Sequence, residues 1–156
     1  MLVAMRPLAL AAAVAASVAF AGAVGGASKQ TSAEARYALE VEAWCGRWWT
    51  AYAALGEPET MAEWASRLVR TAPLVAEQEQ EFARLRPPAS YRSQAARISA
   101  HMEDEKPIAR QMLAAAGRGD ERAFERLVAG LEPSGREWND AMRRIGAYGC
   151  AASPTA

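Results

Sequence analysis

The sequence predicts an all-α protein: an up-down-up-down four-helix bundle with proline kinks, preceded by a signal peptide. Helix-forming residues dominate the chain, and no segment shows the alternation of apolar and polar residues that a strand requires. Apolar residues instead recur at steps of three and four, which places them on one face of a helix. Short Gly- and Pro-containing segments at 56–58, 86–88 and 117–120 divide the chain into four helical stretches. Short connections make sequential helices antiparallel neighbours.

The first expected helix begins with the capping-box sequence of residues 31–34 and ends at Gly56. We expect the second to begin with Pro58 in its first turn and to reach Leu85. The inward face of the first helix contains Tyr37, Val41, Trp44, Trp48, Tyr52 and Leu55. That of the second contains Met61, Trp64, Leu68, Thr71, Val75, Gln78, Phe82 and Leu85, two of which are polar.

The third expected helix extends from about Pro88 to Ala116, and the fourth begins at Asp120, a favourable N-cap residue. The inward positions of the third helix are Tyr91, Ala95, Ile98, Met102, Glu105, Ala109, Met112 and Ala116. The fourth has an apolar seven-residue repeat formed by Phe124, Leu131, Trp138 and Ile145.

Three prolines fall inside these helices. Pro73, Pro107 and Pro133 each remove a backbone hydrogen bond, so we expect each to kink its helix. Because the seven-residue repeat continues past Pro133, the fourth helix is expected to be one bent helix. Residues 134–137 also have capping-box spacing, which would fit a break at the same place.

The amino terminus has the layout of a signal peptide, which we place at residues 1–27. One positive charge precedes an uncharged, Ala-rich run, and small residues follow it at three candidate cleavage sites between 21 and 27. The alternative is a retained anchor, because the uncharged stretch approaches the roughly 20 residues that span a bilayer. Cleavage is favoured, since Ala and Gly make a poor span. We expect membrane contact only if the segment is retained.

The mature chain is predicted to be secreted or extracytoplasmic, with one helical domain at 28–150 and a flexible tail at 151–156. The full sequence has 18 Lys and Arg residues and 18 Asp and Glu residues, and loss of Arg6 with the signal peptide leaves the mature chain with 17 positive and 18 negative side chains, so it is close to neutral. A surface that binds nucleic acid needs an excess of positive charge. We therefore expect a protein or small-molecule partner and no nucleic acid.

Cys45 and Cys150, the only cysteines, are expected to form a structural disulfide in the oxidising compartment that exported proteins reach. They are 105 residues apart, which excludes a CxxC redox motif. In straight helices Cys45 would lie about 16 Å from the Gly56 end and Cys150 about 40 Å from it. The disulfide therefore requires that the tail fold back from Gly146 or that the chain bend sharply at 133–135.

With these residues placed, the chain resembles a group of uncharacterised secreted helical proteins of high-GC, actinobacterial-type bacteria. The matching features are Tyr37 and Cys45, Leu85-Arg86-Pro87-Pro88, Gly119-Asp120, and Gly146 followed by Cys150. The resemblance covers nearly the whole mature chain and implies a helical fold, export and the disulfide, with no activity attached. Many such proteins carry a lipoprotein cysteine at the mature start, which this chain lacks, so lipid attachment is not implied.

His101 is the only histidine, and Met102 and an acidic run follow it. One His and one Met inside a bundle can ligate haem or copper, so a metal or haem carrier centred on His101 and Met102 is the alternative function. The chain has no CxxCH motif, and Glu105 follows His101 by four residues, the spacing of an ordinary helix-surface pair. We favour the pair and predict no cofactor.

Glu105 is expected at an inward position, where a carboxylate needs a partner. Together with His101 and with Thr71 and Gln78 of the second helix, it would form a buried polar layer or a small ligand pocket. The alternative, which we favour, is that the helix register drifts at Pro107 and Glu105 reaches solvent.

No residue pattern indicates an enzyme. Ser and Asp residues have no partnering His by sequence, and there is no Gly-rich phosphate loop. We therefore predict a non-enzymatic exported protein that acts as an interaction or small-ligand-binding module.

Overall fold

The computed structural model describes residues 30–151, which are helical and contain no strand. The elements are α1 (Ser32–Ala53), α2 (Met61–Arg84), the 3-10 turn η1 (Ala89–Tyr91), α3 (Arg92–Gly117), α4 (Glu121–Gly130), α5 (Glu132–Ile145) and α6 (Tyr148–Ala151). The predicted all-α class is confirmed. The expected signal peptide and tail residues 152–156 lie outside the described residues. Within 30–151, no helix is both long enough and apolar enough to cross a membrane.

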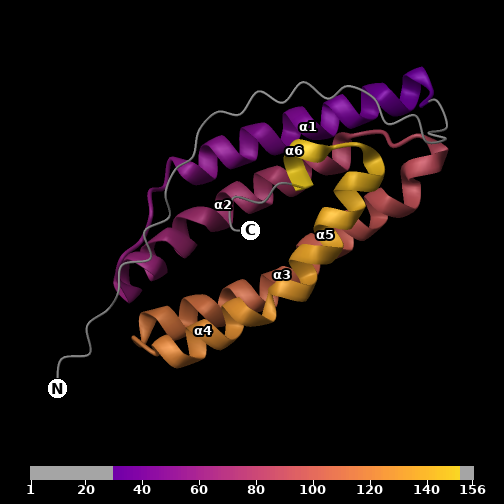
Figure 1. The fold of residues 1–156 in the computed structure, drawn as a ribbon. Coiled ribbons are helices and arrows are strands. Elements are labelled where there is room, and N and C mark those ends of the chain that lie inside the picture. The colour runs from indigo at the N-terminus through magenta and orange to yellow at the C-terminus, as the bar shows by residue number, and fades with distance from the viewer. Residues whose placement is uncertain (1–29, 152–156) are drawn as a thin grey trace, which may run out of the picture.

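The long helices run back and forth beside one another (Figure 1). α2 packs against α1 and α3, and α3 also packs against α4 and α5, which follow one another back along it. The short α6 closes the chain by packing against both α5 and α1. The stretch expected as a fourth helix is thus a pair of helices on one side of α3.

Two helix starts have the N-caps that the sequence predicted. At α1 the Thr31 hydroxyl accepts from the Glu34 amide at 3.2 Å, and the Glu34 carboxylate accepts from the Thr31 amide at 2.7 Å. At α4 the Asp120 carboxylate accepts from the Ala123 amide at 3.0 Å.

Two other helix starts differ from the expectation. The N-cap of α2 is Thr60, whose hydroxyl accepts from the Glu63 amide at 3.2 Å, so Pro58 precedes the helix and is not in its first turn. The same Thr-x-x-Glu signal that marks α1 is present at Thr60 and Glu63. α3 begins at Arg92 and not near Pro88, because Pro88 is extended and caps the 3-10 turn that comes first.

Leu131 divides the stretch expected as one bent helix. It ends α4 and precedes α5, with φ −80° and ψ −16°. Pro133 falls in the first turn of α5, where its missing N–H leaves no intrahelical bond unmade. The break therefore occurs two residues before the proline. Pro73 and Pro107, by contrast, lie inside α2 and α3, which continue through them.

Gly146 turns the end of α5 back toward α1. Its φ of 89° is left-handed, and the amides of Gly146 and Ala147 bond the carbonyls of Arg143 at 3.1 Å and Met142 at 3.0 Å. This is a Schellman motif, which glycine favours because it has no Cβ. The tail thus folds back from Gly146, which is one of the two ways in which the sequence allowed Cys150 to reach Cys45.

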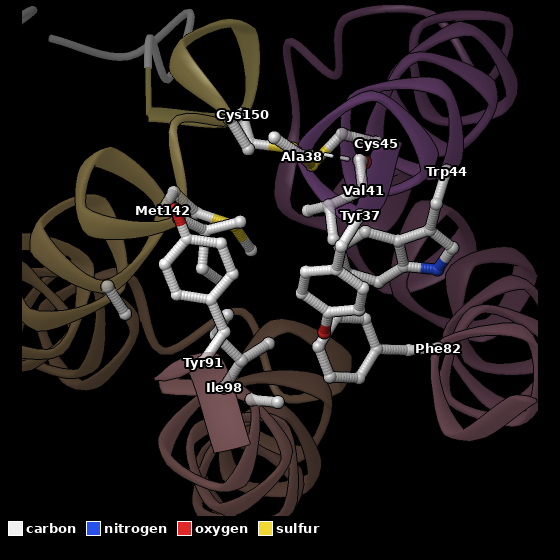
Figure 2. Close-up of a cluster of buried hydrophobic side chains, with 14 of the residues drawn as sticks. Tyr37, Ala38, Val41, Trp44, Cys45, Phe82, Tyr91, Ile98, Met142 and Cys150 are labelled. Atoms are coloured by element: carbon white, nitrogen blue, oxygen red, sulfur yellow. Dashed lines mark hydrogen bonds between the residues drawn. A yellow bond between two sulfur atoms is a disulfide. The ribbon is translucent and has the colours of Figure 1, made fainter. Parts of the chain in front are cut away.

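The returning tail carries Cys150 to Cys45 on α1, and the two form a disulfide with a Cα–Cα distance of 5.6 Å (Figure 2). The predicted pairing is therefore present in the structure. Ala151, which the sequence assigned to the tail, is instead the buried last residue of α6.

The buried side chains form two clusters. The larger joins α1, α5 and α6 to the end of α2 and the start of α3, and contains Tyr37, Val41, Trp44, Phe82, Ile98 and Met142 (Figure 2). The smaller joins α2, α3 and α4 through Met112, Ala115, Ala116 and Phe124, with Met61, Trp64 and Leu68 packed against them. Glu105 lies on the stretch of α3 between the residues that belong to the two clusters.

Arg67 of α2 is buried, which the sequence did not indicate. Its exposed fraction is 3%. The guanidinium donates to the Gly56 carbonyl, lies 3.4 Å from the Glu57 carboxylate and sits 4.3 Å above the Tyr52 ring. These contacts compensate for burying the charge and hold the loop between α1 and α2.

Candidate functional site

A groove of about 680 Å³ lies between α3 and α5. The α3 wall comes from residues between 97 and 104, and the α5 wall from residues between 133 and 144. The side chains that matter most for its chemistry are Arg97, His101, Asp104, Ser134, Glu137 and Trp138. The groove therefore borders the larger apolar cluster and exposes charged groups along its rim.

Three polar side chains meet at the His101 position. The Ser134 hydroxyl is 2.8 Å from His101 Nδ1 and 3.4 Å from Glu105 Oε1, and the same Glu105 oxygen is 3.3 Å from His101 Nε2. The side chain of His101 is 14% exposed and that of Glu105 is 40% exposed. Both ring nitrogens of the histidine are thus already next to oxygen atoms.

The His101 ring also rests on Trp138, with 5.0 Å between the ring centroids. Trp138 in turn lies 6.0 Å from the buried Trp44 of α1, so the site is anchored on the larger apolar cluster. The histidine therefore has its ring plane supported by one neighbour and its nitrogens by two others. This combination fixes its orientation at the groove wall.

Ser134 is the residue that the sequence analysis missed. The expectation that no serine has a partnering histidine is wrong, because α5 places Ser134 against His101 across the α3–α5 contact. The pairing depends on how two antiparallel helices are aligned with each other, which periodicity within one helix does not fix. One sequence signal could have pointed to Ser134: Pro133 marks a helix start, which places the polar Ser134 in the first turn of α5.

The Ser134, His101 and Glu105 side chains include the residue types of a nucleophile, a base and an orienting carboxylate. Their arrangement differs from a catalytic one. Glu105 contacts Ser134 as well as His101, so it competes with the His101 ring for the hydroxyl proton. The amide of Gly135, which follows the serine, already donates to the Leu131 carbonyl at 2.9 Å and is not free to stabilise an oxyanion.

The other predicted polar residues do not join this cluster. The Thr71 hydroxyl donates to the Arg67 carbonyl of its own helix at 2.9 Å. Gln78 is buried, and its backbone carbonyl accepts from the Trp44 indole at 3.0 Å. The structure therefore brings Glu105 and His101 together at α5, whereas the Thr71 hydroxyl is bonded within its own helix.

Residues that could hold a metal or haem are also separated. Met102 is buried in the larger apolar cluster, whereas His101 faces the groove. Among residues 30–151, no group of three or more His, Cys, Asp or Glu side chains is placed to hold a metal ion.

The charged side chains of the rim come from both walls of the groove. Arg97 and Asp104 are seven residues apart on α3, two helical turns and about 10 Å, and Glu137 and Arg144 have the same spacing on α5. Because α5 runs antiparallel to α3 and Ser134 contacts His101, Glu137 comes close to the level of Arg97, so charges of opposite sign are not separated to the two ends of the groove.

No protein-family model, curated protein or solved structure matches this chain. The resemblance to secreted helical proteins of high-GC bacteria accordingly stays a prediction. What the protein binds must be inferred from the groove, and above all from its fixed histidine, its aromatic wall and its charged rim.

Proposed function

We propose that this is an exported, non-enzymatic protein that binds a small ligand in the groove between α3 and α5, on a scaffold that corresponds to an up-down-up-down four-helix bundle. The layout of residues 1–27 and the Cys45–Cys150 disulfide support export to an oxidising compartment. The run of α4 and α5 back along α3 supports treating the two together as the fourth member of the bundle.

The observation that carries the proposal is the fixed His101 ring in a groove of about 680 Å³. Small-ligand sites are concavities of roughly 300 to 1,000 Å³ with apolar walls and a few oriented polar groups. Ser134, Glu105 and Trp138 hold the ring in place before any ligand arrives. Such preorganisation lowers the entropic cost of binding.

The alternative, a metal or haem carrier centred on His101 and Met102, has less support. A ligating histidine must offer one ring nitrogen to the metal. Here both nitrogens of His101 contact oxygen atoms of Ser134 and Glu105, and Met102 points into the core.

The test is a screen of small acids, amines and short peptides against the isotope-labelled protein by NMR. We expect binding compounds to shift the Trp138 indole and His101 ring signals. Ser134→Ala removes one partner of His101, so it should weaken binding by roughly 1 kcal/mol, about fivefold.

The matched control is Ser99→Ala, which makes the same change on the exposed side of α3 away from the groove. It should leave affinity unchanged. Equal affinities in the two variants, or signal changes confined to residues distant from α3 and α5, would contradict the proposal.

A further inference from the structure

We infer that α6 is a lid over the Cys45–Cys150 disulfide, and that an external thiol reduces this bond only after α6 has detached locally from α1 and α5. The inference concerns the redox behaviour of the fold and does not depend on a ligand in the α3–α5 groove. It follows from the burial of both cysteines and from the way in which a four-residue helix is held in place.

Both cysteines are closed to solvent in the folded protein. The exposed fraction is 2% for Cys45 and 0% for Cys150, and Ala147 and Ala151 on either side of Cys150 are buried as well. Figure 2 shows the bond between α1 and the short α6. Thiol–disulfide exchange depends on access of the attacking thiolate to a sulfur atom. The closed fold therefore does not react with an external thiol.

Reduction begins when a thiolate reaches one of the two sulfurs. A thiolate of dithiothreitol attacks that sulfur and forms a mixed disulfide, and the S–S bond breaks as the other cysteine leaves as a thiolate. The second thiol of dithiothreitol then closes the ring and releases the first cysteine. The reagent leaves as a cyclic disulfide, and the protein gains two electrons and two protons as two thiols.

α6 is the smallest element whose movement uncovers the bond. Its outer residues, Tyr148 and Gly149, are exposed. The Gly149 amide donates to the Glu42 carboxylate of α1 at 2.7 Å, which tethers the two helices in addition to the disulfide. A helix of four residues is not stable by itself in water, because isolated helices shorter than about 12 residues are marginal. α6 is thus held by its tether, its buried side chains and the covalent bond.

The turn at Gly146 separates the movement of α6 from the rest of the fold. α5 ends at Ile145, and the left-handed Gly146 reverses the chain before α6 begins. α6 can therefore lift without unfolding α5. Local openings of this kind require less free energy than global unfolding.

The test is the rate at which dithiothreitol reduces the native protein, followed by mass spectrometry of the alkylated thiols at urea concentrations below the global transition. We expect reduction on the order of 100-fold slower than in the unfolded protein, because only the open fraction reacts. The dependence on urea should be less than about a third of the global m-value, since m scales with the surface exposed. Oxidised glutathione in the same solutions corrects for effects of urea on the exchange reaction.

A pair of variants on α1 assigns the opening to α6. Glu42→Ala removes the acceptor of the Gly149 amide and should speed reduction about fivefold, the effect of one lost hydrogen bond. Glu40→Ala is the matched control, because the exposed Glu40 carboxylate contacts Arg36 of its own helix. It should leave the rate unchanged. Urea unfolding of both oxidised variants measures their global stability separately.

Three results would each overturn the inference. Native protein that is reduced as fast as unfolded protein has a bond that is already open to solvent. A dependence on urea equal to the global m-value means that the whole fold must open. Equal reduction rates for Glu42→Ala and Glu40→Ala mean that the element that moves is not α6.

Discussion

The buried hydroxyl of Tyr37 makes the stability of the folded state depend on pH. Its side chain is 2% exposed, and its hydroxyl has no hydrogen-bond partner among residues 30–151. Desolvation, with a smaller contribution from the charge of Glu40, raises the pKa of Tyr37 from 10.0 to about 12. The phenol therefore stays protonated in the folded state at pH values where it ionises in the unfolded state.

This shift predicts a loss of stability at high pH. Below pH 10 Tyr37 is protonated in both states, and between about pH 10 and pH 12 only the unfolded state releases the proton, so the free energy of unfolding falls as the pH rises. Tyr37→Phe should change stability at pH 7 by no more than about 1 kcal/mol and should reduce this decline. Urea unfolding followed by tryptophan fluorescence from pH 7 to pH 11 measures both quantities.

Tyr91→Phe is the matched control, because the Tyr91 hydroxyl accepts from the Gln30 side chain at 2.9 Å. It should cost about 1 kcal/mol at pH 7 and keep the decline. The pKa of Lys106 is also raised, first by Glu103 and then by Glu79, and that contribution too is lost as the pH rises, but equally in both variants. A decline as steep in Tyr37→Phe as in Tyr91→Phe would refute the assignment.

Single-residue predictions succeeded where the cause is local. The spacing of His101 and Glu105 indicated their contact, since residues four apart on a helix are neighbours. Ser134 and Arg67 were missed because their partners come from other elements. A charged residue gives no sequence signal of burial when its compensating groups are a loop carbonyl and a ring on another helix.

At the scale of elements, helix ends marked by their own side chains were predicted well. The Thr31 and Asp120 caps are examples, and Thr60 carries the same capping-box signal as Thr31, two residues after Pro58. The break at Leu131 is different. A seven-residue apolar repeat runs across it, because α4 and α5 both turn their apolar faces toward α3 and so preserve the pattern through the interruption.

Gly146 and Gly135 test the backbone requirements of α5 with the same substitution. Gly146→Ala places a Cβ in a left-handed conformation and 3.1 Å from the Gln30 side chain, so we expect a loss of about 1 to 2 kcal/mol. Gly135→Ala adds a Cβ inside the helix with nothing within 4 Å, so we expect a gain of up to about 1 kcal/mol. Chemical denaturation of both variants measures these changes.

Opposite signs for the two variants are the essential outcome. If Gly146→Ala were neutral, the fold-back of the tail would not depend on a left-handed residue. If Gly135→Ala were as damaging as Gly146→Ala, the helical assignment of residue 135 in α5 would be wrong.

At the scale of the whole molecule, the helical class was predictable because it depends on the composition and on the spacing of the apolar residues along the chain. The groove was not. Its existence depends on the alignment of α3 with α5 and on the separation of the buried side chains into two clusters. Both are properties of packing between elements, so a pattern read along one helix at a time does not contain them.

The disulfide is the strongest single constraint on the whole chain. It closes a loop with a sequence separation of 105, which should stabilise the fold by about 4 to 5 kcal/mol in the chain-entropy description. Replacing both Cys45 and Cys150 by Ala should lower the free energy of unfolding by this amount. Guanidinium unfolding with and without reductant is the measurement.

The double variant should be insensitive to reductant, which serves as the internal control. Cys45→Ala alone should lose about as much stability as the double variant, because either change removes the covalent link. Wild-type protein whose unfolding is the same before and after reduction would show that the link does not contribute as described.

The position of this link near both ends of the described chain has one more consequence. A protease that cuts any single peptide bond between Cys45 and Cys150 leaves two fragments that are still covalently joined. Nicked molecules would therefore migrate as intact protein on a non-reducing gel and separate only after a thiol is added.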